Sequence, residues 1–196
     1  MLKNLHQSNH RIYKYFLIGS NGLLGNELKK ILPKKDTICS AKKNSDININ
    51  LYNLKNLEKI FNKFKFQNVL NVVAETDINK CEKNKLNCKK INLDLPIKLA
   101  ALSQKHNFKL IQLSTDQVYR SKNFSKNKEG DKTSYYNYYS KTKFLAENNI
   151  KKIKNHLIIR TNFTGFKKNN KKTFISWLTA EIKKKKKIIL FNDMIC

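Results

Sequence analysis

Along this chain, runs of apolar residues alternate with segments in which apolar residues recur every three or four positions. The runs predict strands at 13–18, 36–40, 68–74, 108–114, 156–160 and 187–191. The periodic segments predict helices at 22–32, 54–64, 92–106, 138–151 and 173–184. Because strand and helix alternate without a break in composition, we expect an α/β fold built on a doubly wound parallel sheet.

Ligands of such sheets bind at the carboxyl ends of the strands. The predicted strands place Gly19, Ala74, Thr115 and Thr161 along that edge. We therefore expect these four positions to line one cleft.

Three glycines follow the first predicted strand, at Gly19, Gly22 and Gly25. Glycine lets a backbone approach a phosphate closely and adopt positive φ, and the start of the next helix attracts an anion. This pattern favours a pyrophosphate site. The spacing G-x-x-G-x-x-G differs from the commonest dinucleotide fingerprint, G-x-G-x-x-G, so a glycine-rich turn without a ligand is the alternative.

Two further features carry candidate chemistry. Ser114 and Thr115 end a predicted strand, and Tyr139 and Lys143 lie four residues apart on one helix face. We expect the lysine ammonium to lower the pKa of the phenol, so that it can exchange a proton with an alkoxide while a nicotinamide delivers hydride. The alternative is coincidence, because eight tyrosines share the chain with many lysines, and a Ser-Thr pair can simply cap a turn. The order of turn, Ser-Thr and Tyr-x-x-x-Lys argues against three separate coincidences.

The formal net charge of +27 raises the possibility of a nucleic-acid-binding protein. Arginine occurs only at Arg11, Arg120 and Arg160, however, and the lysines are spread through nearly every segment. A dedicated binder concentrates charge on one face and mixes it with arginine and aromatic residues. A coding bias toward A and T explains the abundant lysine, asparagine and isoleucine equally well. We expect no specific nucleic-acid partner.

The four cysteines have neither zinc-site spacing nor a disulfide pattern, so free thiols in a reducing cytoplasm and no metal site are expected. No apolar run is long enough to cross a bilayer, and the N-terminus does not have the form of a signal peptide. These features predict a cytoplasmic protein with no membrane partner.

Several segments together carry a family resemblance. They are Asn-Val-Val-Ala-Glu-Thr-Asp-Ile-Asn-Lys-Cys-Glu (71–82), Ser-Thr-Asp-Gln-Val-Tyr (114–119), Tyr-Ser-Lys-Thr-Lys-Phe-Leu-Ala-Glu (139–147), Asn92 before Leu95 and Pro96, and Arg160-Thr161. As a set, in this order, they resemble the extended short-chain dehydrogenases/reductases, and most closely the dTDP-4-dehydrorhamnose reductase group. The resemblance implies a Rossmann-type NAD(P)-binding fold and a nucleotide-sugar substrate.

The resemblance also implies residue roles. Tyr139 would be the general acid in reduction, Lys143 would hold the nicotinamide ribose, and Thr115 would orient the carbonyl. The positions implied around the cofactor pyrophosphate are Gly19, Asn21, Gly22, Leu23, Leu24 and Gly25, with Ala74 and Thr76 near the cofactor's middle.

The end of the second strand bears on cofactor choice. An acidic residue there would accept the ribose 2′-hydroxyl of NAD, but this chain has Ser40, Lys42 and Lys43. We expect NADP to be preferred, with NAD as an alternative, and with Lys42 or Lys43 pairing the 2′-phosphate. Asp46 would reverse this preference if the strand ended later.

The chain departs from the family pattern at Ser140, Tyr135 and Glu75, where the family has glycine, proline and an apolar or aromatic residue. Family members are also longer. We expect residues 13–160 to form the NAD(P)-binding domain and 161–196 to form a partial, truncated substrate-binding lobe, with weak or absent reductase activity as the consequence.

The function predicted from the sequence is NADP-linked reduction of a nucleotide-activated 4-keto-6-deoxy sugar. Two alternatives stay open: a non-catalytic NAD(P)-binding homologue or regulatory subunit, and a sugar-nucleotide epimerase or dehydratase of the same superfamily. A homodimer is also left open.

Overall fold

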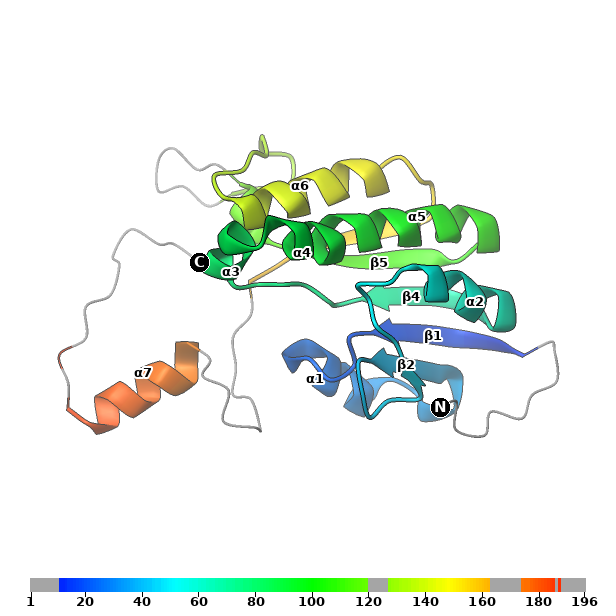
Figure 1. The fold of residues 1–196 in the computed structure, drawn as a ribbon, viewed down its shortest axis with the longest axis horizontal. Coiled ribbons are helices and arrows are strands. Elements are labelled where there is room, and N and C mark those ends of the chain that lie inside the picture. Colours follow the sequence, from blue (N-terminus) through cyan, green and yellow to red (C-terminus); the bar gives the residue numbers. More distant parts are fainter. Residues whose placement is uncertain (1–10, 120–126, 163–173, 186, 188–196) are drawn as a thin grey trace.

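The computed structural model describes residues 11–119, 127–162, 174–185 and 187 of the 196-residue chain. Within these ranges one parallel sheet carries the fold (Figure 1). Its strands are β1 (Ile12–Ile18), β2 (Thr37–Ala41), β3 (Ile47–Asn48), β4 (Lys65–Asn71), β5 (Lys109–Ser114) and β6 (His156–Arg160).

The strand order is β3-β2-β1-β4-β5-β6, and every pairing is parallel. The chain starts in the middle of the sheet, winds outward to β3, crosses back over β1 to β4 and then winds outward to β6. This arrangement confirms the predicted α/β fold with a doubly wound parallel sheet.

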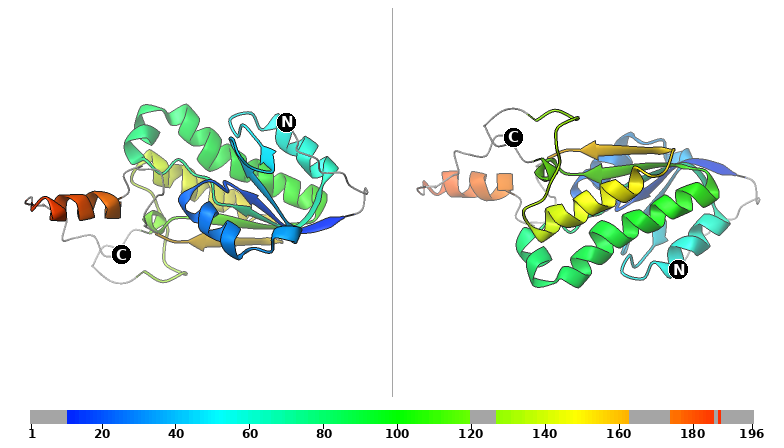
Figure 2. Two further views of the ribbon diagram at one scale, coloured as in Figure 1. Left: turned by 90° about the horizontal axis from the view of Figure 1, so that it is seen from below. Right: turned by 90° about the horizontal axis from the view of Figure 1, so that it is seen from above.

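Helices cover the sheet from both faces (Figure 2). Helix α1 (Leu23–Ile31) lies on one face, while α2 (Lys55–Lys63), α5 (Leu95–His106) and α6 (Tyr138–Ile150) lie on the other. Two short helices, α3 (Ile78–Lys83) and α4 (Lys85–Lys89), lead through a π-helical turn at Lys90–Asp94 into α5. Helix α7 (Phe174–Lys183) follows β6 in the chain.

The core is aromatic on the face that α2 and α5 cover. Phe16 of β1 stacks on Phe66 of β4 with ring centroids 4.7 Å apart, and Phe61 of α2 stacks on Phe108 at 4.9 Å. All four side chains are buried. The apolar stripe predicted on the helix at 54–64 is therefore the stripe that packs on the sheet.

Most predicted elements are confirmed within a residue or two of their ends, and His156–Arg160 agrees at both ends. The prediction for β4 was wrong by three residues at each end, because Lys65 and Phe66 pair with Ile12 and Tyr13 of β1. The two-residue β3 was not predicted. The last predicted strand, 187–191, lies outside the described residues except for its first position.

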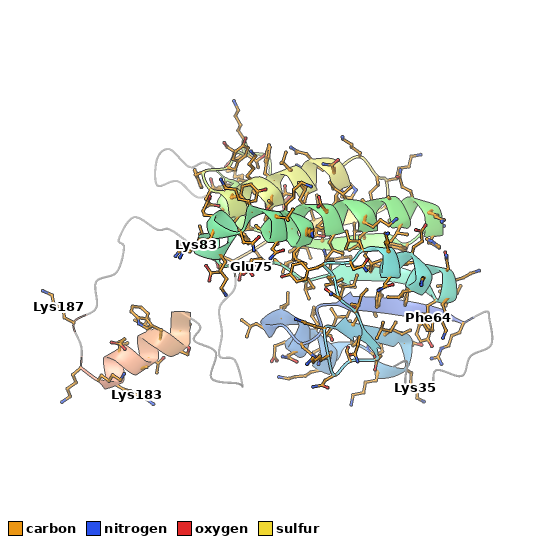
Figure 3. All side chains as sticks on the ribbon, in the orientation of Figure 1. Lys35, Phe64, Glu75, Lys83, Lys183 and Lys187 are labelled. Atoms are coloured by element: carbon orange, nitrogen blue, oxygen red, sulfur yellow. The ribbon has the colours of Figure 1, made fainter. Side chains whose placement is uncertain are left out.

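The candidate site residues lie at one end of the sheet, beyond the carboxyl ends of the strands. Phe64 and Lys35 lie at the amino-terminal end of the strands, whereas Glu75 lies in the loop at the carboxyl-terminal end (Figure 3). Gly19, Thr115 and Thr161 directly follow β1, β5 and β6. Ala74, expected at the end of its strand, lies three residues beyond the end of β4.

Candidate active site

The glycine turn between β1 and α1 is built from backbone contacts. Gly19 has φ of +96°, and the amides of Gly19 and Ser20 both donate to the carbonyl of Ser40, at 2.9 and 3.0 Å. A Cβ atom placed on Gly25 would lie 2.2 Å from the carbonyl oxygen of Gly19. Only glycine at these two positions allows α1 to start so close to the end of β1.

The start of α1 leaves its backbone donors available. Gly22 is the N-cap and provides no side-chain cap, and the first turn carries no acidic residue. Leu23 and Leu24 follow as the first helical residues and are half-buried. Exposed amides at the positive end of a helix favour an anion such as a pyrophosphate.

The loop after β2 is tied to this turn. Asn21 donates from Nδ2 to the carbonyl of Lys43 at 2.7 Å, and Lys29 donates to Asn21 Oδ1 at 3.0 Å. Lys42 and Lys43 directly follow the strand and are exposed. The strand therefore ends one residue after the predicted end, and the backbone of Lys43 contacts the glycine turn through Asn21.

Two side chains near that strand end bear on the cofactor, one without a hydrogen-bond partner and one with a partner. Ser40 is fully buried, and its hydroxyl has no hydrogen-bond partner among the described residues. Asp46 accepts from the amide of Cys39 at 2.9 Å. A buried hydroxyl without a partner, beside a glycine turn and two lysines, fits the adenosine end of a dinucleotide.

The loop after β4 is held by Asn92 of the π-helical turn. Asn92 accepts from the amide of Glu75 and donates to its carbonyl, both at 2.9 Å. Ala74 precedes this clamp and is half-buried, and Thr76 follows it and is exposed. Asn92 is fully buried, which fixes the course of the loop.

Helix α6 begins with an N-terminus that is held by a capping box and by a side chain of α3. Asn137 and Ser140 form a capping box, in which the side chain of each accepts from the backbone of the other. Glu82 of α3 accepts from the amide of Tyr138 at 2.6 Å. Ser140, which departs from the family glycine, therefore has a structural role in this chain.

The two candidate catalytic side chains of α6 are buried. Tyr139 is 7% exposed and Lys143 is 3% exposed. Tyr139 packs against Cys81 and Cys88 of the short helices. Lys143 donates from Nζ to the carbonyl of Leu113, one residue before the end of β5, at 2.6 Å.

Thr115 completes the set at the end of β5. It is 4% exposed and caps the next turn, accepting from the amide of Gln117 at 3.2 Å. A hydrogen bond with Thr115 also acts on the phenol of Tyr139. The structure therefore brings Thr115, Tyr139 and Lys143 together at the carboxyl ends of the strands.

Burial is the largest influence on the pKa values of Tyr139 and Lys143. Burial raises the pKa of Tyr139, although the hydrogen bond with Thr115 opposes the change. Burial lowers the pKa of Lys143 to about 8, against the opposing effects of Glu147 and Cys88. The expectation that Lys143 lowers the pKa of Tyr139 was wrong, because the desolvation of the phenol dominates and the ammonium bonds to Leu113 instead.

Several groups that shape the site had no role predicted from the sequence, although Glu82, Glu147 and Arg160 stand in the segments that carry the resemblance. Glu147 is buried and pairs with the half-buried Arg160, and Glu82 and Asn137 hold the N-terminus of α6. Glu147 could have been found from its spacing, since it lies four residues after Lys143 and eight after Tyr139, on the same helix face.

Comparison with known proteins places this geometry in a family. The model of the RmlD substrate binding domain matches residues 13–195. The chain belongs to this family.

Named relatives agree with the assignment. A dTDP-4-dehydrorhamnose reductase of Clostridium acetobutylicum is 29% identical, with a TM-score of 0.74 over 87% of this chain. The corresponding reductase of Bacillus anthracis, solved in complex with NADP, is 22% identical, with a TM-score of 0.69 over 78% of this chain and 54% of its own. A probable low-salt glycan biosynthesis reductase, Agl14, of Haloferax volcanii is 22% identical over 190 residues, or 91% of this chain.

This chain of the RmlD family spans 63% of the length of the Haloferax protein and 60% of the Clostridium reductase. Within the described residues, no group of three or more acidic, histidine or cysteine side chains could hold a metal ion. None of the described helices is long and apolar enough to cross a membrane.

Proposed function

We propose that this member of the RmlD family is an NADP-linked reductase of a nucleotide-activated 4-keto-6-deoxy sugar. The observation that carries the proposal is the buried cluster of Thr115, Tyr139 and Lys143 at the same carboxyl-terminal edge of the sheet as the glycine-bounded start of α1, which has no side-chain cap. Each half alone has a structural explanation. Together they supply a dinucleotide site and a proton donor at the same edge of the sheet.

Tyr139 is the general acid. Its raised pKa keeps the phenol protonated at neutral pH, which is the form needed to donate a proton to the alkoxide produced by reduction. Thr115, on the adjacent strand end, hydrogen-bonds the same carbonyl oxygen and orients it. When bound, NADPH supplies the hydride that this carbonyl carbon accepts.

Lys143 is a positioning cation for the cofactor. Its ammonium is desolvated and already anchored on Leu113, so the head group is held in place before any ligand arrives. In that place it can hydrogen-bond the nicotinamide ribose. Its lowered pKa limits the function to pH values at which the ammonium persists.

The residues around the glycine turn fit the rest of the cofactor. Gly19, Gly22 and Gly25 allow the pyrophosphate to approach the amides of Asn21 to Leu24, and the exposed Lys42 and Lys43 suit a 2′-phosphate. Ser40 provides a free buried hydroxyl, and Ala74 and Thr76 lie at the loop after β4. The NADP in the Bacillus structure supports this choice of cofactor.

We assign residues 13–160 to the cofactor-binding domain and 161–196 to part of a substrate-binding lobe. The test is NADPH consumption with a dTDP-4-keto-6-deoxy sugar, with the protein in excess so that slow turnover is detected. The Clostridium enzyme is the positive control, and a Tyr139→Phe variant sets the background. Reduced sugar formed above that background supports the proposal. Tight NADPH binding without any reduction would instead favour a non-catalytic cofactor-binding subunit.

A further inference from the structure

One buried carboxylate joins three elements next to the candidate active site. Glu147 of α6 is 1% exposed. Its Oε1 accepts from the hydroxyl of Ser114, the last residue of β5, at 2.5 Å. Arg160, the last residue of β6, donates to both carboxylate oxygens, from Nε at 3.1 Å to each and from Nη2 to Oε2 at 2.7 Å.

The arginine extends the contact toward the start of the same helix. Arg160 donates from Nη1 to the hydroxyl of Tyr119 at 2.8 Å, and its guanidinium lies 4.8 Å from the centre of that ring. Tyr136 in turn donates its hydroxyl to the carbonyl of Tyr119. Tyr136 lies one residue before Asn137, the N-cap of α6. The network therefore touches α6 both at Glu147 and beside its N-terminus.

Fold stability alone is a weak explanation for this arrangement. Removing a carboxylate and a guanidinium from water costs about as much as their attraction returns, and apolar replacements of the same volume are often as stable. What such a pair supplies is geometry, because a fork-to-fork contact has one favourable orientation.

The hydrogen-bond network around Glu147 lies next to all three candidate catalytic residues. Glu147 lies one helical turn after Lys143 and two turns after Tyr139. Ser114 directly precedes Thr115. The same carboxylate therefore holds the helix that carries two of the candidate catalytic groups and the strand end that carries the third.

We infer that Glu147 is a positioning residue, whose carboxylate sets the end of β5 and helix α6 at the separation that Thr115 and Tyr139 need to share one substrate oxygen. This inference rests on the proposed function for its effect on turnover. A misplacement of about 1 Å in such a set costs on the order of a hundredfold in rate, so the energetic value of the network appears mainly in kcat.

Charged groups from every neighbouring element act on this pair. Glu147 faces Arg160 from β6, and Lys151 from its own helix at 3.8 Å. Lys143 interacts electrostatically with Glu147 on α6 and with Cys88 on α4. Because Glu147 raises the pKa of Lys143, its neutralisation must move that pKa further down.

The test compares Glu147→Gln with Glu58→Gln. Glu58 is a matched control, since it also pairs with two basic side chains but lies on α2, away from the site. For Glu147→Gln we expect kcat to fall at least tenfold, KM and NADPH affinity to change less than threefold, and the alkaline limb of the pH–rate profile to move to lower pH. For Glu58→Gln we expect none of these changes. Unchanged kcat in a folded Glu147→Gln protein would overturn the inference.

Ser114→Ala gives a milder variant that keeps the ion pair. We expect it to reproduce part of the kcat loss, with unchanged far-ultraviolet circular dichroism. If Glu147→Gln fails to fold, Ser114→Ala decides the question by itself, and a kcat within twofold of the parent value would refute the link between Glu147 and Thr115.

A second measurement needs no activity, so a failure of the proposed function can be told apart from a failure of this inference. Backbone hydrogen exchange in Ser114→Ala and Glu147→Gln should accelerate both at 113–115 and at 137–143. Faster exchange confined to the turn around residue 147 would overturn the inference, whether or not the protein reduces a sugar.

Discussion

The glycine turn and the cluster at the ends of β5 and β6 serve one site by opposite means. Gly19 and Gly25 matter because they lack side chains: a Cβ on Gly25 would lie 2.2 Å from a carbonyl oxygen. Thr115 and Lys143 matter because of the partners that their side chains find. The turn depends on the absence of side chains at its glycines, and the cluster depends on specific side-chain contacts.

The two regions are therefore sensitive to opposite kinds of substitution. A larger side chain at a glycine disrupts the turn, whereas a side chain that loses a polar group disrupts the cluster. The turn bonds through backbone groups, and any sequence that keeps the glycines can preserve them. The cluster bonds through side chains contributed by segments far apart in the sequence.

The largest effect is expected in the cluster. Tyr139→Phe removes one hydroxyl and should lower kcat at least about a hundredfold, because a lost general acid typically costs 10²–10⁴ in rate. NADPH affinity should stay nearly constant, as measured by fluorescence titration. Tyr52→Phe, at an exposed tyrosine with no proposed role in proton transfer, is the control. Unchanged turnover in Tyr139→Phe would remove this phenol from the mechanism.

The matching experiment in the turn adds one methyl group. Gly25→Ala should lower the free energy of unfolding by roughly 1–3 kcal/mol, the usual cost of overpacking, and weaken NADPH binding by about ten- to a hundredfold. Gly130→Ala is the control, because a Cβ there meets nothing within 4 Å. Thermal unfolding and NADPH titration measure both effects. Equal behaviour of the two variants would show that the turn tolerates side chains.

A third prediction concerns pH. Since burial lowers the pKa of Lys143 to about 8, its ammonium is present below that pH and is lost above it. Reduction should therefore be fastest at neutral pH and fall by roughly tenfold per pH unit well above the pKa. Steady-state rates from pH 6 to 10 would measure this. A rate that stayed level through pH 9 would contradict the role of Lys143.

The smallest effect is expected next to the glycine turn, in the loop that follows β2. A Lys42→Ala, Lys43→Ala double variant should reduce the preference for NADPH over NADH by roughly three- to tenfold, since exposed charges contribute modestly and are screened by salt. Lys34→Ala, Lys35→Ala is a charge-matched control. If the parent chain binds NADH as tightly as NADPH, the assignment of these lysines to a 2′-phosphate is wrong.

The sequence predicts the turn better than the cluster for a physical reason. Gly19, Gly22 and Gly25 are local, and a strand, a turn and a helix start can be deduced from their neighbours alone. Helix α6 and strand β6 were predicted for the same reason. The predicted position of strand β4 was wrong because Lys65 and Phe66 belong to the strand through their pairing with β1, about fifty residues earlier in the sequence. The local apolar pattern does not show this pairing.

The contacts of the cluster depend on distant pairs. Ser114 and Glu147 are 33 residues apart, and Glu147 and Arg160 are 13 apart. No local pattern shows that these side chains meet. The direction of the pKa shift of Tyr139 was mispredicted because it depends on burial, which only the packed structure reveals.

The most direct test of the central claim is single-turnover transfer of deuterium from NADPH labelled at nicotinamide C4 to a dTDP-4-keto-6-deoxy sugar. Both C4-labelled stereoisomers are needed, with the protein in excess over the sugar. If this chain is an NADPH-linked reductase with Tyr139 as its general acid, deuterium appears at C4 of the reduced sugar from one stereoisomer, and this transfer is lost in Tyr139→Phe. Bound NADPH with no deuterium in the sugar, while the Clostridium reductase transfers it, would contradict the proposed function.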